Sequence, residues 1–402
     1  MTPAAGLIMR RHRGRGLMQL PGPTNVPAAV LSAIGEPTLD HRGKPFAALV
    51  RSVLGDVATT FGTAGPVALY PGSGSGGWEA ALVNTLAGGD RVAVCRTGYF
   101  SDGWASLASK LGLDVVVVPG RYGQAADPVA LGRFLSDPGA GGRDVRAVLV
   151  VHNETSTGVT TDVGAVRRTL DDLGHPALLF VDAVSSLGAM PVDHDGWRAD
   201  VTITASQKGL MLPPGLVLLA VSEKARATRR PGGLPCGYWE WEPMLSACLS
   251  GSFPYTPSSN LIVGLRVALD LIADEGLDRV FRRHRRLADA TSAAAEHWGL
   301  SLVCEETECR SSSVTAVQLP QGVDESAIRD DLVERFAVTV GGGLGELKGR
   351  CLRIGHLGDV DELMVVSTIA SIEAILRANS VPIVVGGVDA AMNSLEGTRV
   401  ER

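Results

Sequence analysis

The sequence lacks the features that mark several large classes of protein. Its six cysteines include no Cys-x-x-Cys pair, so neither a structural zinc site nor a disulfide framework is indicated. The chain also has no excess of basic residues, since its formal net charge is −6. This charge argues against a nucleic-acid or anionic-membrane partner. No hydrophobic run reaches the roughly 20 residues that a membrane span requires. We therefore expect a cytoplasmic protein with reduced thiols, no metal site, and neither nucleic acid nor membrane as a partner.

One cluster of positive charge lies near the start of the chain, at Arg10, Arg11, Arg13 and Arg15. No apolar segment of about 7 to 15 residues follows it, so it does not have the form of a secretory signal. We interpret residues 1–20 as an N-terminal arm.

Seven apolar runs, separated by helix-compatible stretches, predict the fold of the longest part of the chain. The runs are PVALY, RVAVC, DVVVV, RAVLVVHN, ALLFVDAV, DVTIT and LVLLAVS. Strands this apolar, alternating with helices, are typical of a mostly parallel sheet covered by helices on both faces. We predict one large α/β domain over residues 21–262. Sustained helical spacing over residues 259–300, followed by short strands and two helices, predicts a smaller C-terminal α+β domain over residues 263–385 and a tail over residues 386–402.

A glycine-rich turn follows the first apolar run, in the stretch YPGSGSGGWEAALVNTL. Glycines let the backbone approach an anion, and a helix that begins near Trp78 would offer unpaired N–H groups to it. Gly72, Gly74 and Gly77 also satisfy the dinucleotide-binding pattern, but the next strand does not end in the acidic residue that binds ribose. We therefore favour a lone phosphate held by Ser73, Gly74 and Ser75, with a ligand-free turn as the alternative.

Two charged residues follow later strands. Asp182 ends the run LLFVD, where a carboxylate either caps a helix or faces the ligand-binding edge of an open sheet. Lys208 comes 26 residues later, in the otherwise neutral stretch ITASQKGLMLPPGL, where an amine needs a partner or a chemical role. A lysine, a carboxylate and a phosphate cradle at one edge are the parts of a pyridoxal 5′-phosphate site.

The chain resembles the class-V, fold-type I pyridoxal-phosphate aminotransferases, especially the serine-glyoxylate and alanine-glyoxylate branch. The resemblance is carried by PGPTNVP, DHRG, GWEAALVNTL, VVHNETSTGV, VDAVSSLG, SQKGLMLPPGL, FPYTP, LRIGHLGD and GGVDAAM, in this order along nearly the whole chain. It implies pyridoxal 5′-phosphate as cofactor and a homodimer with a shared active site. It also implies transfer of an amino group from serine or alanine to glyoxylate, with aspartate or another small amino acid as the alternative donor.

The resemblance also implies the roles of individual residues. Lys208 matches the lysine that attaches the cofactor, and Asp182 matches the partner of the pyridine nitrogen. Phe100 in TGYF matches the aromatic residue stacked on the cofactor ring, with Tyr99 or a simple core phenylalanine as alternatives. Other matching positions are the phosphate-loop residues Ser73, Gly74 and Ser75, then Thr155 near the ring hydroxyl and Gln207 at the phosphate. Serine at position 75 replaces the threonine typical of the family and keeps the hydroxyl.

The resemblance assigns two further positions outside these segments. Thr256 in FPYTP matches a phosphate ligand donated by the neighbouring subunit. Arg353 in CLRIGHLGD matches the arginine that binds the substrate carboxylate, a role suited to its planar fork of donors, with a plain surface arginine as the alternative. Arg42 in DHRG is either a charge at the entrance or part of a fold-stabilising pair. His41, His152 and His356 are expected to be structural.

Two other functions are weighed against this one. A cysteine desulfurase would need a histidine directly before the lysine, where this chain has Gln207, and a nucleophilic cysteine on a loop, whereas Cys351 lies in a strand-like run. A non-catalytic regulator that only senses the cofactor would be expected to carry a DNA-binding extension, which the sequence lacks.

Overall fold

The structure, a computed structural model, describes residues 16–137, 139, 141–228 and 232–397. The arginine cluster of the predicted arm lies outside these residues. Within them, no helix combines the length and the apolar character needed to cross a bilayer.

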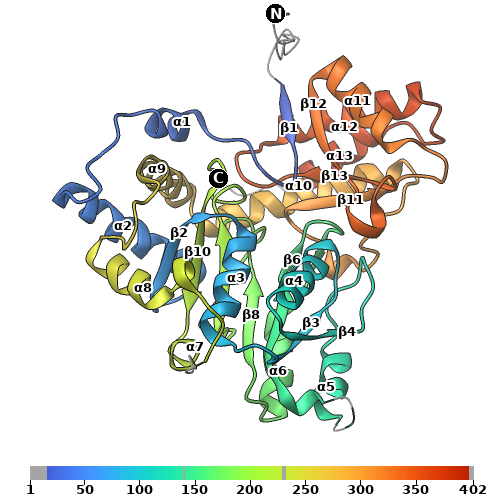
Figure 1. Cartoon of the computed structure of the whole chain (residues 1–402). Helices are drawn as coiled ribbons and strands as arrows, with labels where there is room; N and C mark the ends of the chain where they lie inside the picture. Colours follow the sequence, from blue (N-terminus) through green and yellow to red (C-terminus); the bar gives the residue numbers. More distant parts are fainter. Residues whose placement is uncertain (1–15, 138, 140, 229–231, 398–402) are drawn as a thin grey trace, which may run out of the picture.

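A seven-stranded sheet forms the centre of the larger part of the molecule (Figure 1). Its strands are β2 (Val67–Gly72), β3 (Arg91–Cys95), β4 (Asp114–Val118), β5 (Val145–Val151), β8 (Leu178–Asp182), β9 (Val201–Ala205) and β10 (Gly215–Val221). Their order is β2-β10-β9-β8-β5-β3-β4, and β10 runs antiparallel to both of its neighbours while the other pairs are parallel. All seven predicted runs are therefore strands. Because β10 reverses direction between β9 and β2, the C-terminal ends of β2, β3, β5, β8 and β9 share one edge.

Helices cover both faces of this sheet. The helices of the larger part are α1 (Ala28–Ile34), α2 (Lys44–Phe61), α3 (Gly74–Thr85), α4 (Tyr99–Lys110), α5 (Pro128–Ser136), α6 (Val163–Asp172), α7 (Glu223–Ala227), α8 (Trp241–Ser250) and α9 (Ser259–Glu275), of which α1 packs on α9. Neighbouring strand residues belong to different cores: Val94 packs in the core that includes α2, α3 and α9, while Ala93 and Cys95 pack in the core that includes α5 and α6. This is the expected result of side chains that alternate across a pleated strand.

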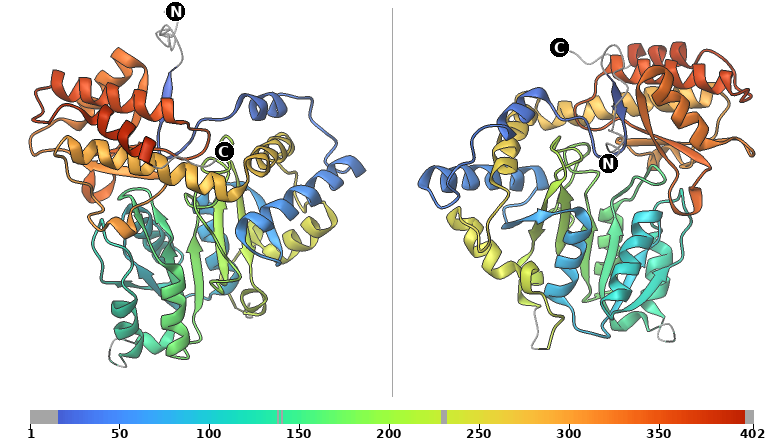
Figure 2. Two further views of the ribbon diagram at one scale, coloured as in Figure 1. Left: turned by 180° about the vertical axis from the view of Figure 1, so that it is seen from behind. Right: turned by 45° about the horizontal axis from the view of Figure 1, so that its top comes forward.

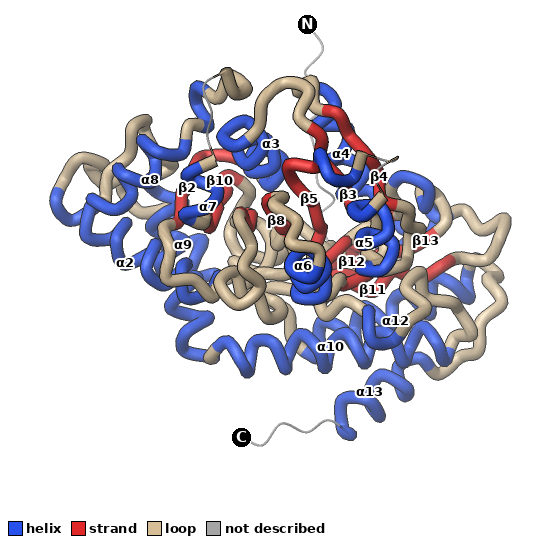
Figure 3. The backbone as a smooth tube through the Cα atoms, turned by 90° about the horizontal axis from the view of Figure 1, so that it is seen from below, coloured by secondary structure: helices blue, strands red, loops and turns tan. Residues whose placement is uncertain are grey.

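A second, four-stranded sheet lies in the other part of the molecule. Its strands are β1 (Leu17–Gln19), β11 (Val314–Gln318), β12 (Val338–Gly342) and β13 (Cys351–Gly355), in the order β1-β12-β13-β11. The helices of this part are α10 (Leu277–His297), α11 (Glu325–Phe336), α12 (Glu362–Ala378) and α13 (Gly387–Gly397). Figure 2 shows this part above the larger one, and Figure 3 shows α13 beside α10. The short elements of the chain are β6 (Asn153–Glu154), β7 (Val159–Thr160), η1 (Gly142–Asp144), η2 (Gly237–Trp239), η3 (Thr307–Cys309) and η4 (Gly345–Leu347).

Three segments near the predicted domain boundaries pack as follows. Residues 17–19, inside the predicted arm, pair in parallel with residues 338–340 of β12 (Figure 1). Helix α9 extends beyond residue 262 and keeps its apolar face on the core of the larger part, against α1 and α2. Helix α13, inside the predicted tail, buries Ala391 and Leu395 in the core of the smaller part.

Candidate active site

A cavity of about 160 Å³ opens at the edge where the C-terminal ends of the parallel strands meet. The chain reaches this cavity in five separate segments, each of which follows a different strand. Its lining includes eight of the predicted site residues: Ser73, Gly74, Ser75, Phe100, Thr155, Asp182, Gln207 and Lys208. Residues that are spread along the sequence are thus brought together by the sheet topology.

Lys208 follows β9, and its partly buried side chain lines the cavity. Its ammonium donates a hydrogen bond of 2.5 Å to the carbonyl oxygen of Pro21, and none of the described carboxylates forms an ion pair with it. Burial and the positive charge of Arg353 lower the pKa of Lys208 to about 8, and the negative charge of Asp182 opposes this shift. The amine therefore loses its proton more readily than an ordinary lysine, as a proton-transfer group requires.

Asp182 is the last residue of β8 and is only 4% exposed. Its Oδ2 accepts a hydrogen bond of 2.8 Å from the indole Nε1 of Trp78, and its Oδ1 accepts one of 2.7 Å from the backbone of Val184. Burial raises the pKa of Asp182 to about 6, while these two hydrogen bonds oppose the rise. No described helix begins directly after Asp182, so the side chain is not a helix cap.

The glycine-rich turn places the start of α3 at the cavity. Ser73 is the N-cap of this helix and makes no side-chain capping bond, so the N–H groups of Gly74 and Ser75 keep no partner within the helix. A Cβ atom at Gly74 would lie 2.7 Å from a methyl group of Val184, and this close approach explains the glycine. The arrangement offers several donors to an anion at one end of the cavity.

Phe100 lines the cavity from the first turn of α4. Its backbone N–H donates to the carboxylate of Glu154, which is buried at the end of β6 and has a raised pKa because of that burial. Tyr99 is 43% exposed and is not part of the cavity lining. Of the two aromatic residues considered from the sequence, Phe100 is the one beside the cavity.

Arg353 reaches toward this region from β13 of the other sheet. Its Nε donates to the carbonyl oxygen of Gly342 at 2.6 Å, and its Nη1 donates to that of Thr155, a cavity residue, at 3.2 Å. The side chain has no carboxylate partner among the described residues, and burial lowers its pKa. The guanidinium thus retains donors for an external carboxylate.

The other predicted positions lie outside the cavity lining. Thr256 is exposed in the segment between α8 and α9, and Arg42 is exposed just before α2. His356 is buried between the hydroxyl of Thr315 and the carbonyl oxygen of Ser312.

Comparison with known proteins identifies the family of the chain. The model of the family described as aminotransferase class-V matches residues 20–346. The chain belongs to the class-V aminotransferases. Among its relatives, the serine-glyoxylate aminotransferase of Methylorubrum extorquens is 43% identical over 391 residues, which cover 96% of each chain. The L-aspartate-glyoxylate aminotransferase of Paracoccus denitrificans is 40% identical over 381 residues, which cover 94% of this chain and 96% of the relative.

Solved structures support the same assignment. The pyridoxamine-pyruvate aminotransferase of Mesorhizobium loti matches with a TM-score of 0.89 and 28% identity, covering 97% of this chain and 99% of the other. The expected fold of this class-V aminotransferase, that of fold-type I pyridoxal-phosphate enzymes, is confirmed.

Free polar groups around the cavity of this class-V aminotransferase fit pyridoxal 5′-phosphate. Lys208 supplies an amine that makes no ion pair with the described carboxylates, Asp182 supplies a buried carboxylate, and the start of α3 supplies N–H groups that have no partner within the helix. Among the described residues the buried side-chain Oε1 of Gln207 has no hydrogen-bond partner, so no bond at this oxygen prevents the amide from turning its Nε2 donor toward a phosphate.

The sequence analysis missed five cavity residues of the class-V aminotransferase: Trp78, Val151, Asn153, Val184 and Ser185. Asn153 donates to the hydroxyl groups of Ser185 and Ser313 at 2.7 Å each, and so links the ends of β5 and β8 to β11. The five missed residues lie in the segments GWEAALVNTL, VVHNETSTGV and VDAVSSLG. Their closeness in sequence to predicted site residues was the signal that could have identified them.

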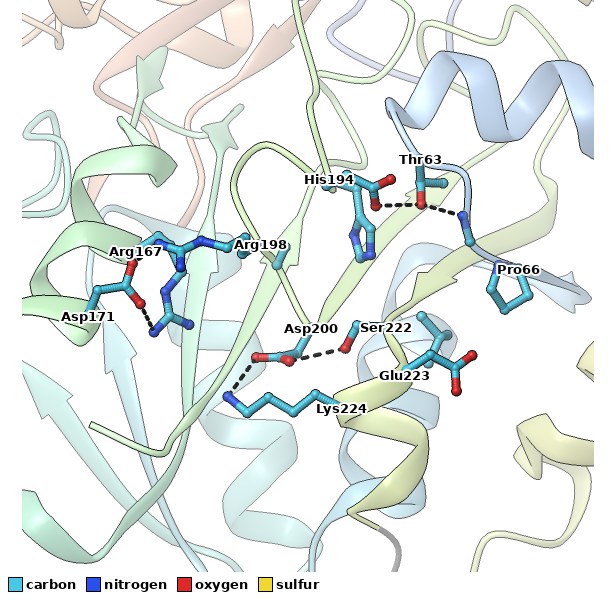
Figure 4. A pocket seen from close by; sticks show the side chains of 14 residues that line it. Thr63, Pro66, Arg167, Asp171, His194, Arg198, Asp200, Ser222, Glu223 and Lys224 are labelled. Carbon is cyan, nitrogen blue, oxygen red and sulfur yellow. Dashed lines mark hydrogen bonds and ion pairs between the residues drawn. The ribbon is translucent and has the colours of Figure 1, made fainter. Parts of the chain in front are cut away.

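A larger cavity, of about 510 Å³, lies at the opposite edge of the sheet (Figure 4). None of the predicted site residues lines it. Arg167 and Arg198 pair with Asp171, and Lys224 pairs with Asp200, which directly precedes β9. Because these cations already have carboxylate partners, the smaller cavity is the better candidate for the active site of the class-V aminotransferase.

Proposed function

We propose that the protein is a pyridoxal 5′-phosphate-dependent aminotransferase that moves the amino group of serine or alanine to glyoxylate. The products are glycine and either hydroxypyruvate or pyruvate. One observation carries the proposal. In a chain of the class-V aminotransferase family, the amine of Lys208 and the buried carboxylate of Asp182 line the same cavity.

The chain's own groups account for the steps that the reaction requires. When bound, the cofactor supplies a ring that accepts the electrons released as the α-proton leaves. Asp182 would hold a proton on the ring nitrogen, and Ser73, Gly74, Ser75 and Gln207 would hold the phosphate. The neutral amine of Lys208 would take the α-proton of the amino acid at Nζ and return it in the next step. Arg353 would orient the substrate through its carboxylate.

The structure favours a small donor. Arg353 is the one predicted carboxylate-binding group near the cavity, and the exposed Arg42 is not part of the lining. Aspartate would bring a second carboxylate, and burying that charge without a partner is costly. The relatives include both serine-glyoxylate and aspartate-glyoxylate enzymes, so aspartate remains the alternative donor.

We further propose a homodimer in the cytoplasm. The exposed position of Thr256, away from the cavity of its own chain, is compatible with a role as phosphate ligand in a neighbouring subunit. All six cysteines are free thiols, as is usual in a reducing compartment.

Spectra and steady-state kinetics of the cofactor-loaded protein distinguish an aminotransferase from a cofactor sensor and identify the amino donor. The protein loaded with cofactor should change its visible absorbance on addition of serine and release hydroxypyruvate, and glyoxylate should then restore the original spectrum and yield glycine. The variant Lys208→Ala should lose multiple turnover. A protein that binds the cofactor but releases no oxo acid would be a sensor rather than an enzyme. Values of kcat/KM for serine, alanine and aspartate at fixed glyoxylate identify the donor, and a tenfold preference for aspartate that Arg42→Ala abolishes would overturn the choice of serine or alanine.

A further inference from the structure

Trp78 stands between two groups of the proposed cofactor site. It is the fifth residue of α3, follows directly after the glycine-rich turn and is 6% exposed. Its indole Nε1 donates to Asp182 at 2.8 Å. Its ring lies edge-on to the ring of Phe100, with centroids 6.5 Å apart, and is stacked on the ring of Trp104 at 5.6 Å.

The bond from Trp78 is the one side-chain hydrogen bond that the described residues give to Asp182. The second oxygen of this carboxylate is held by the backbone of its own loop, at Val184. Of the titratable groups that face it, Lys208 favours the ionised form and the buried Glu154 disfavours it. The ring of His152, which directly follows β5, instead contacts Trp197.

We propose that Trp78 is a positioning residue for the cofactor ring. Its N–H fixes the orientation of the Asp182 carboxylate and keeps it ionised, and its ring fixes the plane of Phe100. One side chain thereby aligns the group at the ring nitrogen and the aromatic residue expected to stack on the ring. This inference rests on the proposed function, because it gives Asp182 its role toward the cofactor.

Trp104 provides a matched control. It is fully buried and stacked on Trp78, but its Nε1 has no hydrogen-bond partner in the part of the chain that the structure describes. Replacing either tryptophan by phenylalanine removes the same atoms from the same aromatic stack. Only the change at position 78 removes a bond to Asp182.

The test compares Trp78→Phe with Trp104→Phe in the cofactor-loaded enzyme. Loss of the donor raises the pKa of Asp182, so the acid limb of the kcat profile should move up by about one pH unit in Trp78→Phe, since a hydrogen bond to a charged group contributes at least that much. KM for the amino acid should stay within about twofold, because Trp78 contacts no substrate-binding group. Trp104→Phe should not shift the acid limb of the kcat profile.

Binding to the cofactor-free protein gives a readout that does not depend on activity. Trp78→Phe should weaken binding of pyridoxal 5′-phosphate about tenfold, yet leave binding of its 1-deaza analogue, which has no ring nitrogen, unchanged. Equal losses for both compounds, or equal effects of the two variants, would reduce Trp78 to a packing residue. If Trp78→Phe does not fold, benzothienylalanine at positions 78 and 104, which keeps the ring shape without the N–H, gives the same comparison. A wild-type protein that binds no cofactor would instead overturn the proposed function.

Discussion

The side-chain nitrogen of Lys208 lies 2.5 Å from the carbonyl oxygen of Pro21, and the next residue, Gly22, has no side chain to fill the space beside it. A Cβ atom at Gly22 would overlap Cδ, Cε and Nζ of the lysine. The segment PGPTNVP thus forms the wall that holds the amine at the cavity.

Gly22→Ala should displace the amine. The end of a lysine side chain can move, so we expect the variant to fold, with a lower melting temperature because φ of Gly22 is +126°. At a temperature where it is folded, kcat should fall by roughly 10- to 100-fold. Gly88→Ala, where an added Cβ meets no atom within 4 Å, is the control and should have normal kcat. Equal kcat in both variants would show that Gly22 does not set the position of Lys208.

Asp182→Asn should separate electronic from structural effects. The amide keeps one acceptor oxygen and can bind either Trp78 or Val184, so the fold and part of the cofactor affinity should remain. An amide cannot stabilise a protonated ring nitrogen, so kcat should fall by at least roughly 100-fold, more than the affinity for the cofactor. The measurements are a cofactor titration and steady-state kinetics. Near-normal turnover would mean that Asp182 serves only the fold.

The effect of the same substitution on the stability of the cofactor-free protein should become more favourable as the pH rises. Burial raises the pKa of Asp182 from 3.8 to about 6, so its contribution to stability is present below pH 4 and is lost as the pH rises through 6. Removing the charge should recover up to about 3 kcal/mol at pH 7, and the loss of one acceptor oxygen should offset part of this gain equally at every pH. Chemical denaturation of wild type and Asp182→Asn at pH 4, 5.5 and 7 should give a difference that grows with pH. A constant difference would contradict the raised pKa.

Arg353→Ala should act on substrates according to their charge. A charge-assisted contact contributes roughly 1.5 to 3 kcal/mol, so binding of amino acids and oxo acids should weaken by about 10- to 150-fold. Amines without a carboxylate should react at unchanged rates. Arg350→Ala, which removes an exposed arginine just before β13, is the control. Equal losses for amines and amino acids would assign Arg353 a structural role.

The sequence predicted that Asp182 and Lys208 follow the ends of strands, and the structure brings both to one cavity. Asp182 and Lys208 are exceptional in their local surroundings, so apolar patterning alone singles them out. The bond between Trp78 and Asp182 joins residues 104 positions apart and depends on how α3 packs on the sheet, which local patterning does not encode. The antiparallel direction of β10 could not be predicted either, because the apolar pattern of a strand is the same whichever way the strand runs in the sheet.

The pairing of β1 with β12 has a consequence for how the chain reaches its native state. The edge strand of the smaller sheet comes from residues 17–19, and its other strands come from residues 314–355. The edge strand can therefore pair only when the chain closes a loop that contains the whole larger part. Such a long closure is entropically costly and slow compared with the local pairing of β11, β12 and β13. During synthesis on the ribosome, the larger part can therefore collapse first, while residues 17–19 remain unpaired until β12 has been made. A C-terminal fragment produced alone would expose the unpaired edge of β12 and should aggregate.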